Sequence, residues 1–226
     1  MSLKKFIAFT LAEVLIVLGI IGVAAALTLP TLNDDVEDKK VVAKLRKVAP
    51  ELDGIYQSIV QTYGKPYEWS VPSGQTPASM MQQYFEEMGG ITKSCGTGTG
   101  CFSGTINSNT NYRKFLMKDG SSVGIYIEPA DELAKVNPQY DENYCIGQVG
   151  HILVDVNGIK GENNYGNDVF QFDICSDGVK PSGENGHFVD FGGGESEYNT
   201  AWVIDAGNRD YLYCNDLSWN SKRTCK

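Results

Sequence analysis

The stretch FTLAEVLIVLGIIGVAAALTLP, residues 9–30, decides how this chain is organised. From Phe9 to Leu29 it has 21 residues with a single charged side chain, Glu13, and it follows Lys4 and Lys5. At about 1.5 Å of rise per residue, these residues form a helix of about 31 Å, which matches a bilayer core of about 30 Å. The stretch therefore predicts a membrane-spanning helix, with the two lysines on the cytoplasmic side and the rest of the chain exported.

Two other interpretations of this stretch fit its composition less well. A secretory signal would be cleaved after Ala26, but its apolar core would be longer than the usual ~7–15 residues. A plain membrane anchor would hold Glu13 at membrane depth, at a cost of about 2.5–3.5 kcal/mol by insertion scales. The acid therefore indicates a partner within the apolar layer.

The residues around Glu13 resemble the class III signal of type IV pilins and pseudopilins. A short basic leader ends at Ala8 and is followed by Phe-Thr-Leu-x-Glu at residues 9–13, as in this family. The resemblance implies cleavage between Ala8 and Phe9 by a prepilin peptidase, which also N-methylates Phe9. In the family a glycine usually stands at the position of Ala8, and Glu13 is the fifth residue of the processed chain.

The resemblance implies a structural subunit of a filament that assembles through this helix. Cleavage exposes a positive amine on Phe9, and Glu13 of a neighbouring copy is its expected counter-charge, because buried charges need pairing. The implied partners are copies of the same chain in a helical filament, the prepilin peptidase, an inner-membrane assembly platform, and the membrane before assembly. The implied location is the inner membrane, and then a filament at the cell surface. The alternatives are a type II secretion pseudopilin in a periplasmic fibre and a minor pilin that binds a ligand at the tip.

An amphipathic helix is predicted from residue 31 to residue 64. Its apolar residues are three or four positions apart and so share one face: Val41, Leu45, Val48, Leu52, Ile55, Ile59 and Tyr63. It continues the first helix, with a kink or local loosening at Gly22 and Pro30, since proline removes a backbone donor. Charged residues on the other faces either lie in solvent or make complementary contacts between packed copies: Asp34, Asp35, Glu37, Asp38, Lys39, Lys40, Lys44, Arg46 and Lys47.

The remaining chain predicts a second helix and a β-sheet. Residues 76–88 predict the helix, and four antiparallel strands are predicted at residues 112–117, 123–127, 151–156 and 169–175. The predicted fold class is α+β and pilin-like: a long N-terminal helix, with a membrane-spanning half and an amphipathic half, packs on an antiparallel β-sheet, and the C-terminal region is tied by disulfides. The predicted divisions are a leader (1–8), a transmembrane and assembly helix (9–30) and a globular head (31–226).

Six cysteines, all beyond residue 94, indicate an oxidising compartment. Six allow fifteen pairings, but closeness in sequence favours Cys95 with Cys101 and Cys214 with Cys225, which leaves Cys145 with Cys175. Zinc is the competing interpretation, although these spacings lack a Cys-x-x-Cys pair.

The loop at residues 155–168 concentrates oxygen ligands and glycines. Asp155, Asn157 and Asp168 are candidate ligands for Ca²⁺, which takes six to eight oxygens. The loop is not an EF-hand, because position twelve counted from Asp155 is Gly166 rather than Glu. A turn in which Asp and Asn side chains bond nearby backbone amides is the favoured interpretation.

Charge and motifs argue against nucleic-acid binding and against catalysis. Nineteen Lys and Arg against 28 Asp and Glu give a formal charge of -9, which opposes a duplex-binding surface. His151 and His187 lack a nucleophile motif, residues 191–195 lack the Lys and Ser/Thr of a phosphate loop, and Asp141 with Glu142 is more often solvated surface. We therefore expect a protein that is not an enzyme and requires no cofactor.

Overall fold

The computed structural model describes residues 10–88, 90–136, 141–142, 145–161, 163–183 and 197–225, with side chains excepted at 27–35, 141–142 and 197. The chain divides into two compact units, Met1–Lys40 and Val41–Lys226. The divisions predicted at residues 8 and 30 stay predictions.

One long helix comes first in the chain, and shorter helices lie between and after the strands. The α-helices are α1 (Leu11–Tyr63), α2 (Pro77–Met88), α3 (Gly104–Ser108), α4 (Ala130–Leu133) and α5 (Thr200–Ala206), and the 3-10 helices are η1 (Pro66–Glu68), η3 (Glu197–Asn199) and η4 (Asp210–Leu212). Helix α1 ends where Gly64 takes a positive φ of 77° and its N–H donates to the carbonyl of Val60. Helix α2 begins after Thr76, whose Oγ1 accepts the backbone N–H of Ser79.

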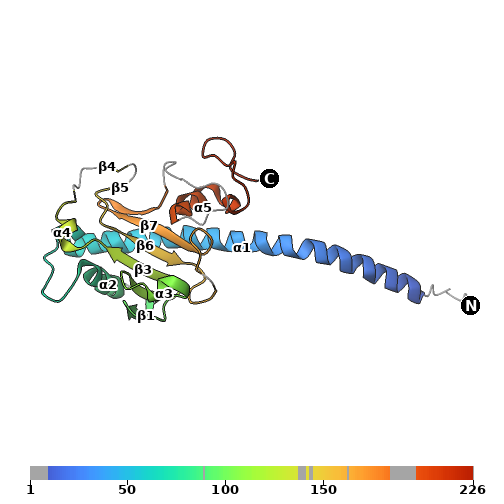
Figure 1. Ribbon diagram of the computed structural model, residues 1–226, viewed down its shortest axis with the longest axis horizontal. Coiled ribbons are helices and arrows are strands. Elements are labelled where there is room, and N and C mark those ends of the chain that lie inside the picture. The colour runs from blue at the N-terminus through green and yellow to red at the C-terminus, as the bar shows by residue number, and fades with distance from the viewer. Residues whose placement is uncertain are drawn as a thin grey trace, which may run out of the picture. The chain divides into compact units, whose positions relative to one another are not determined.

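Six antiparallel strands form the main sheet, in the order β1-β2-β3-β6-β7-β8 (Figure 1). Their bounds are β1 (Ile91–Gly96), β2 (Arg113–Met117), β3 (Ser122–Ile127), β6 (Gly150–Asp155), β7 (Val169–Cys175) and β8 (Gly178–Pro181). A separate ribbon pairs β4 (Asp141–Glu142) with β5 (Cys145–Ile146). The pairing of β1 with β2 contains two register shifts, one between Ile91 and Lys93 and one between Ser94 and Gly96.

One face of the sheet packs against the part of α1 from Val41 onward. The predicted apolar face is confirmed there, because the following residues are buried: Val41, Leu45, Val48, Leu52 and Ile59. Ile55 is only partly buried and Tyr63 is exposed, whereas the buried Tyr56 was not predicted. Alternate residues of the strands complete this core, and the residues between them, such as Leu153 of β6, join a second cluster under α3 on the other face.

The predicted membrane-spanning half of the first helix is wrong. Within the described part of the chain, no helix combines the length and the apolar character needed to cross a membrane. The pilin-like class, which included that half, is corrected with it, while the α+β class and the antiparallel sheet are confirmed.

The four predicted strands are present, but the sheet has two more. Both additional strands lie at the edges, β1 next to β2 and β8 next to β7. Strand β1 has an exposed centre with Lys93 and Ser94, and β8 has four residues and follows a turn. Neither has the apolar alternation that marks a half-buried strand, which explains why the sequence predicts only the four central strands.

Candidate functional site

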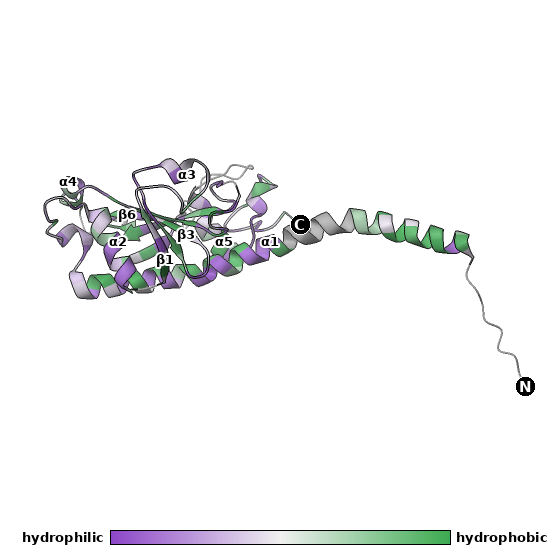
Figure 2. Cartoon of the chain, turned by 90° about the horizontal axis from the view of Figure 1, so that it is seen from below, coloured by the Kyte–Doolittle hydropathy of each residue, from purple (hydrophilic) through white to green (hydrophobic). Residues whose placement is uncertain are grey.

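The N-terminal part of α1 presents a continuous apolar surface. Its large exposed side chains are Leu11, Val14, Leu15, Ile16, Val17, Leu18, Ile20, Ile21 and Val23. Their exposed fractions range from 44% for Val14 to 81% for Leu11, and Figure 2 shows this part of the helix as hydrophobic on the sides in view. Helices that are apolar all round are normally buried. A surface of this kind therefore indicates an interaction site.

Glu13 lies on this surface and is bonded to Thr10. The backbone N–H and the Oγ1 hydroxyl of Thr10 both donate to Glu13 Oε2 at 2.8 Å, and the N–H of Glu13 donates to Thr10 Oγ1 at 3.2 Å. This reciprocal arrangement is a capping box, which satisfies backbone donors in the first turn of a helix. The spacing Thr-x-x-Glu is the sequence signature of a capping box and could have predicted this role of Glu13.

The other predicted assembly residues are placed less fully. Ala8 and Phe9, the predicted cleavage and methylation site, lie outside the described residues. Helix α1 continues through Gly22 and Pro30 without interruption. The kink expected at these two positions stays a prediction, as does pairing of Glu13 with a neighbouring amine.

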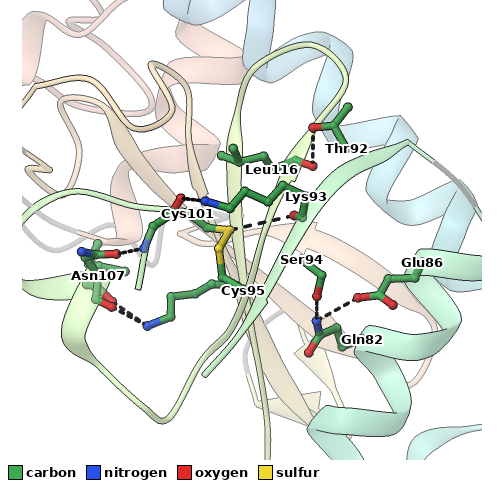
Figure 3. The surroundings of a disulfide bond; sticks show 12 residues. Gln82, Glu86, Thr92, Lys93, Ser94, Cys95, Cys101, Asn107 and Leu116 are labelled. Carbon is green, nitrogen blue, oxygen red and sulfur yellow. Dashed lines mark hydrogen bonds between the residues drawn. A yellow bond between two sulfur atoms is a disulfide. The ribbon is translucent and has the colours of Figure 1, made fainter. Parts of the chain in front are cut away.

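Three disulfides join the six cysteines in the pairs that their spacing favours. The bonds are Cys95–Cys101, Cys145–Cys175 and Cys214–Cys225. The first holds a glycine-rich loop against β1, where Lys93 Nζ donates to the carbonyl of Gly100 at 2.8 Å (Figure 3). The second links β5 to the end of β7, and the third closes the C-terminal tail.

Two carboxylates organise the loop between β6 and β7. Asp155 Oδ1 accepts the backbone N–H groups of Asn157 at 2.9 Å and Gly158 at 3.0 Å. Asp168 Oδ1 accepts the N–H of Asn164 at 2.7 Å, and its Oδ2 accepts Asn157 Nδ2 at 2.8 Å. These are the bonds of the turn that the sequence analysis favoured.

The three candidate calcium ligands lie together, but most of their oxygens already have partners. Of the four carboxylate oxygens of Asp155 and Asp168, only Asp155 Oδ2 accepts no hydrogen bond from a described residue. Asn157 turns its amide nitrogen toward Asp168. No group of three or more His, Cys, Asp or Glu suited to a metal occurs among the described residues. The geometry favours the turn over a calcium site.

Asp155 is a fully buried carboxyl group at this loop. Its pKa is raised to about 7: burial and, to a lesser degree, the charge of Asp168 raise it, and the backbone hydrogen bonds and Lys44 oppose them. Lys44 comes from α1, donates to the carbonyl of Val156 at 2.6 Å and lies 3.8 Å from Asp119 Oδ2. Lys44 was predicted to lie in solvent or between copies, because its spacing along the helix does not show which loop it contacts.

His151 belongs to an aromatic cluster with Tyr112 and Tyr126. Its Nε2 lies 2.7 Å from the hydroxyl of Tyr112, and the ring of Tyr126 stacks on it with centroids 5.0 Å apart. Burial lowers the pKa of His151, and the charge of Asp173 opposes this shift. His187 and residues 191–195 lie outside the described residues, and only the backbone of Asp141 and Glu142 is described.

Lys114 is a buried cation that the sequence did not mark. Its Nζ donates to the carbonyls of Asn107 at 2.7 Å, Asn109 at 2.8 Å and Ile106 at 3.4 Å, so it fastens the end of α3 to β2. Burial lowers the pKa of this lysine. Lys114 directly follows Arg113, so the local sequence does not show which of the two basic side chains is the buried one.

Comparisons with protein-family models, with curated proteins and with solved structures find no match. The functional interpretation therefore depends on the chain's own residues. Among them, the apolar surface of α1 is the feature that most needs a partner.

Proposed function

We propose that this chain is a structural subunit of a filament outside the cytoplasm, of the type IV pilin and pseudopilin kind that its N-terminus resembles. The observation that carries the proposal is the exposed apolar surface of α1 at residues 11–23. Removing such a surface from water is favourable by roughly 1.5–3 kcal/mol for each fully buried Val, Leu or Ile side chain. Every copy of the chain carries the same apolar surface, so self-assembly would bury these surfaces against one another.

The three disulfides support the proposed location. Disulfides form and persist in oxidising compartments, and all six cysteines of the chain are paired. The rigid head that they tie together suits a subunit whose outer surface is exposed to the environment.

The surroundings of the Glu13 carboxylate would change when copies of the chain assemble. In a single subunit its carboxylate is satisfied by Thr10, so the chain does not leave an unpaired acid on its apolar surface. When copies cover that surface, the charge becomes buried and requires a cation. The amine that cleavage would create at Phe9 of an adjacent copy is the group we propose for this role.

A charge introduced into the apolar surface tests the proposal. The full chain is expressed in a bacterium with type IV pilus machinery, and sheared filaments are purified and analysed by mass spectrometry. We expect this chain to be abundant in them, without residues 1–8 and with one added methyl group. Leu18→Asp should reduce the filament yield at least tenfold, since it buries an unpaired charge.

Ile159→Asp is the matched control, because Ile159 is 56% exposed in the head and Leu18 is 61% exposed on α1. We expect normal filament yield from this control. Filaments that lack the chain, or a normal yield from Leu18→Asp, would show that the apolar surface has another purpose.

A further inference from the structure

The loop between β6 and β7 contains a chemically labile dipeptide, Asn157-Gly158. In a flexible chain the backbone nitrogen of a glycine that follows an asparagine loses its proton to water and attacks the side-chain carbon Cγ. A bond forms between this nitrogen and Cγ, the bond from Cγ to Nδ2 breaks, and Nδ2 leaves as ammonia after taking a proton from water. Water then opens the cyclic imide to aspartate or isoaspartate. Glycine favours the reaction because it has no side chain to obstruct the attack.

The fold requires a glycine at the second position of this dipeptide. Gly158 has a positive φ of 77°, which strains other residues, and a Cβ atom there would overlap the backbone carbonyl of Gly120. A bulkier residue at this position would slow the reaction, but it is excluded by this contact. Protection of Asn157 therefore has to come from the groups around the dipeptide.

Two aspartates hold both of the groups that would react. Asp155 Oδ1 accepts the N–H of Gly158, the attacking nitrogen, at 3.0 Å in a buried hydrogen bond. Asp168 Oδ2 accepts Asn157 Nδ2, the leaving nitrogen, at 2.8 Å. Attack would place a nitrogen anion beside the Asp155 oxygen and would turn the Asn157 side chain away from Asp168. Both changes leave buried polar groups without their partners, which is costly.

Both aspartates are buried, and other segments of the head fix the loop that carries them. The N–H of Val156 donates to the carbonyl of Asp168 at 2.9 Å, and Lys44 Nζ donates to the carbonyl of Val156 at 2.6 Å. Arg209, from the C-terminal region, bonds to the carbonyl and to the side chain of Asn167. The start and the end of the loop are therefore held in place.

We infer that Asp155 and Asp168 protect the Asn157-Gly158 dipeptide against deamidation. The inference is independent of the proposed function. Deamidation would damage the turn, because it replaces the Nδ2 donor of Asn157 by a carboxylate oxygen that faces Asp168. Two like charges at this distance disfavour each other, and the isoaspartate product also lengthens the backbone of the turn by one carbon.

Peptide mapping by mass spectrometry, with a separate assay for isoaspartate, tests the inference on the full chain with its disulfides intact. The purified protein is incubated at neutral pH in buffer, where it is folded, and in concentrated urea, where the loop is open. We expect deamidation at Asn157 to be at least tenfold slower in the folded protein than in urea.

Variants separate the two aspartates from the rest of the fold. Asp155→Leu and Asp168→Leu remove the acceptors while nearly keeping the shape of the side chain, and each should raise the rate at Asn157 at least fivefold. Asp155→Asn, which retains an oxygen for the N–H of Gly158, should stay within twofold of the unaltered chain. The control Glu51→Leu, at an exposed acid of α1, should also stay within twofold.

Circular dichroism and thermal unfolding establish that each variant is folded at the temperature of the assay. Where a leucine variant does not fold, the alanine variant at the same position, which needs no additional space, replaces it. Folded variants that deamidate no faster than the unaltered chain would show that the rigid backbone alone protects Asn157. Slower deamidation after substitution of Asp155 would show that Asp155 acts as a base on the Gly158 nitrogen. Either result, or equal rates in buffer and urea, overturns the inference.

Discussion

Asp155 shows at the scale of one residue how a buried acid shapes the stability of this protein. Its pKa is raised to about 7 from an ordinary 3.8, mainly because burial disfavours the charged form. Between about pH 4 and pH 7 the folded chain holds a proton that the unfolded chain has released. The free energy of unfolding therefore falls as the pH rises through this window, and below about pH 4 both states are protonated.

Asp155→Asn should flatten this pH dependence. The amide keeps an oxygen for the backbone N–H groups of Asn157 and Gly158 but does not ionise. Urea unfolding at several pH values between 4 and 7 measures the effect, with Glu51→Gln, an exposed acid on α1, as the control. A slope as steep in Asp155→Asn as in the unaltered chain would mean that another group titrates.

The same carboxylates predict the response to calcium. Three of their four oxygens already accept hydrogen bonds within the loop, so a metal would have to displace them. We expect millimolar Ca²⁺ to produce no heat in a calorimetric titration and no change in the melting temperature. A rise in melting temperature that Asp168→Asn abolishes would instead support the metal interpretation.

Elements in this fold are joined by polar contacts that secondary-structure patterns do not reveal. Lys114 links the end of the short helix α3 to strand β2 through three backbone carbonyls. The positive charge also suits the carbonyl end of a helix. A single side chain therefore holds α3 in place over the second cluster.

Lys114→Met should lower the free energy of unfolding by about 1–3 kcal/mol, because it retains the apolar stem but leaves buried carbonyls without a donor. Denaturant unfolding measures the loss. Lys118→Met, at an exposed lysine in the turn after β2, is the matched control and should change little. Equal stability of the two variants would show that water replaces the Lys114 ammonium without cost.

Sequence patterns predict the central elements well and the edges poorly. The spacing of Val41, Leu45, Val48 and Leu52 identifies the buried face of α1, since burial imposes a helical period on apolar residues. Strand β1 leaves no such period, because its centre is exposed. The positions of Lys44 and Lys114 depend on contacts between segments distant in sequence, which local patterns do not record.

At the scale of the whole molecule, the largest correction concerns the apolar N-terminal segment. Composition alone favoured a membrane span, but no helix in the described part of the chain is both long enough and apolar enough to cross a bilayer. The resemblance at residues 8–17 and the disulfides nevertheless support the proposed assembly outside the cytoplasm. What the sequence could not predict is which charged residues of α1 the head engages, since Lys44 and Arg46 bond to segments distant in sequence.

The two edges of the main sheet have a consequence for crowded subunits. The filament that we propose would hold its subunits at very high local concentration, and an open strand edge under such conditions recruits strands from neighbours. Strand β1 interrupts its edge with two register shifts and the Cys95–Cys101 loop, and β8 is short and ends at Pro181. Both edges thus resist strand exchange, so heads can touch within an ordered array without merging into amyloid-like sheets.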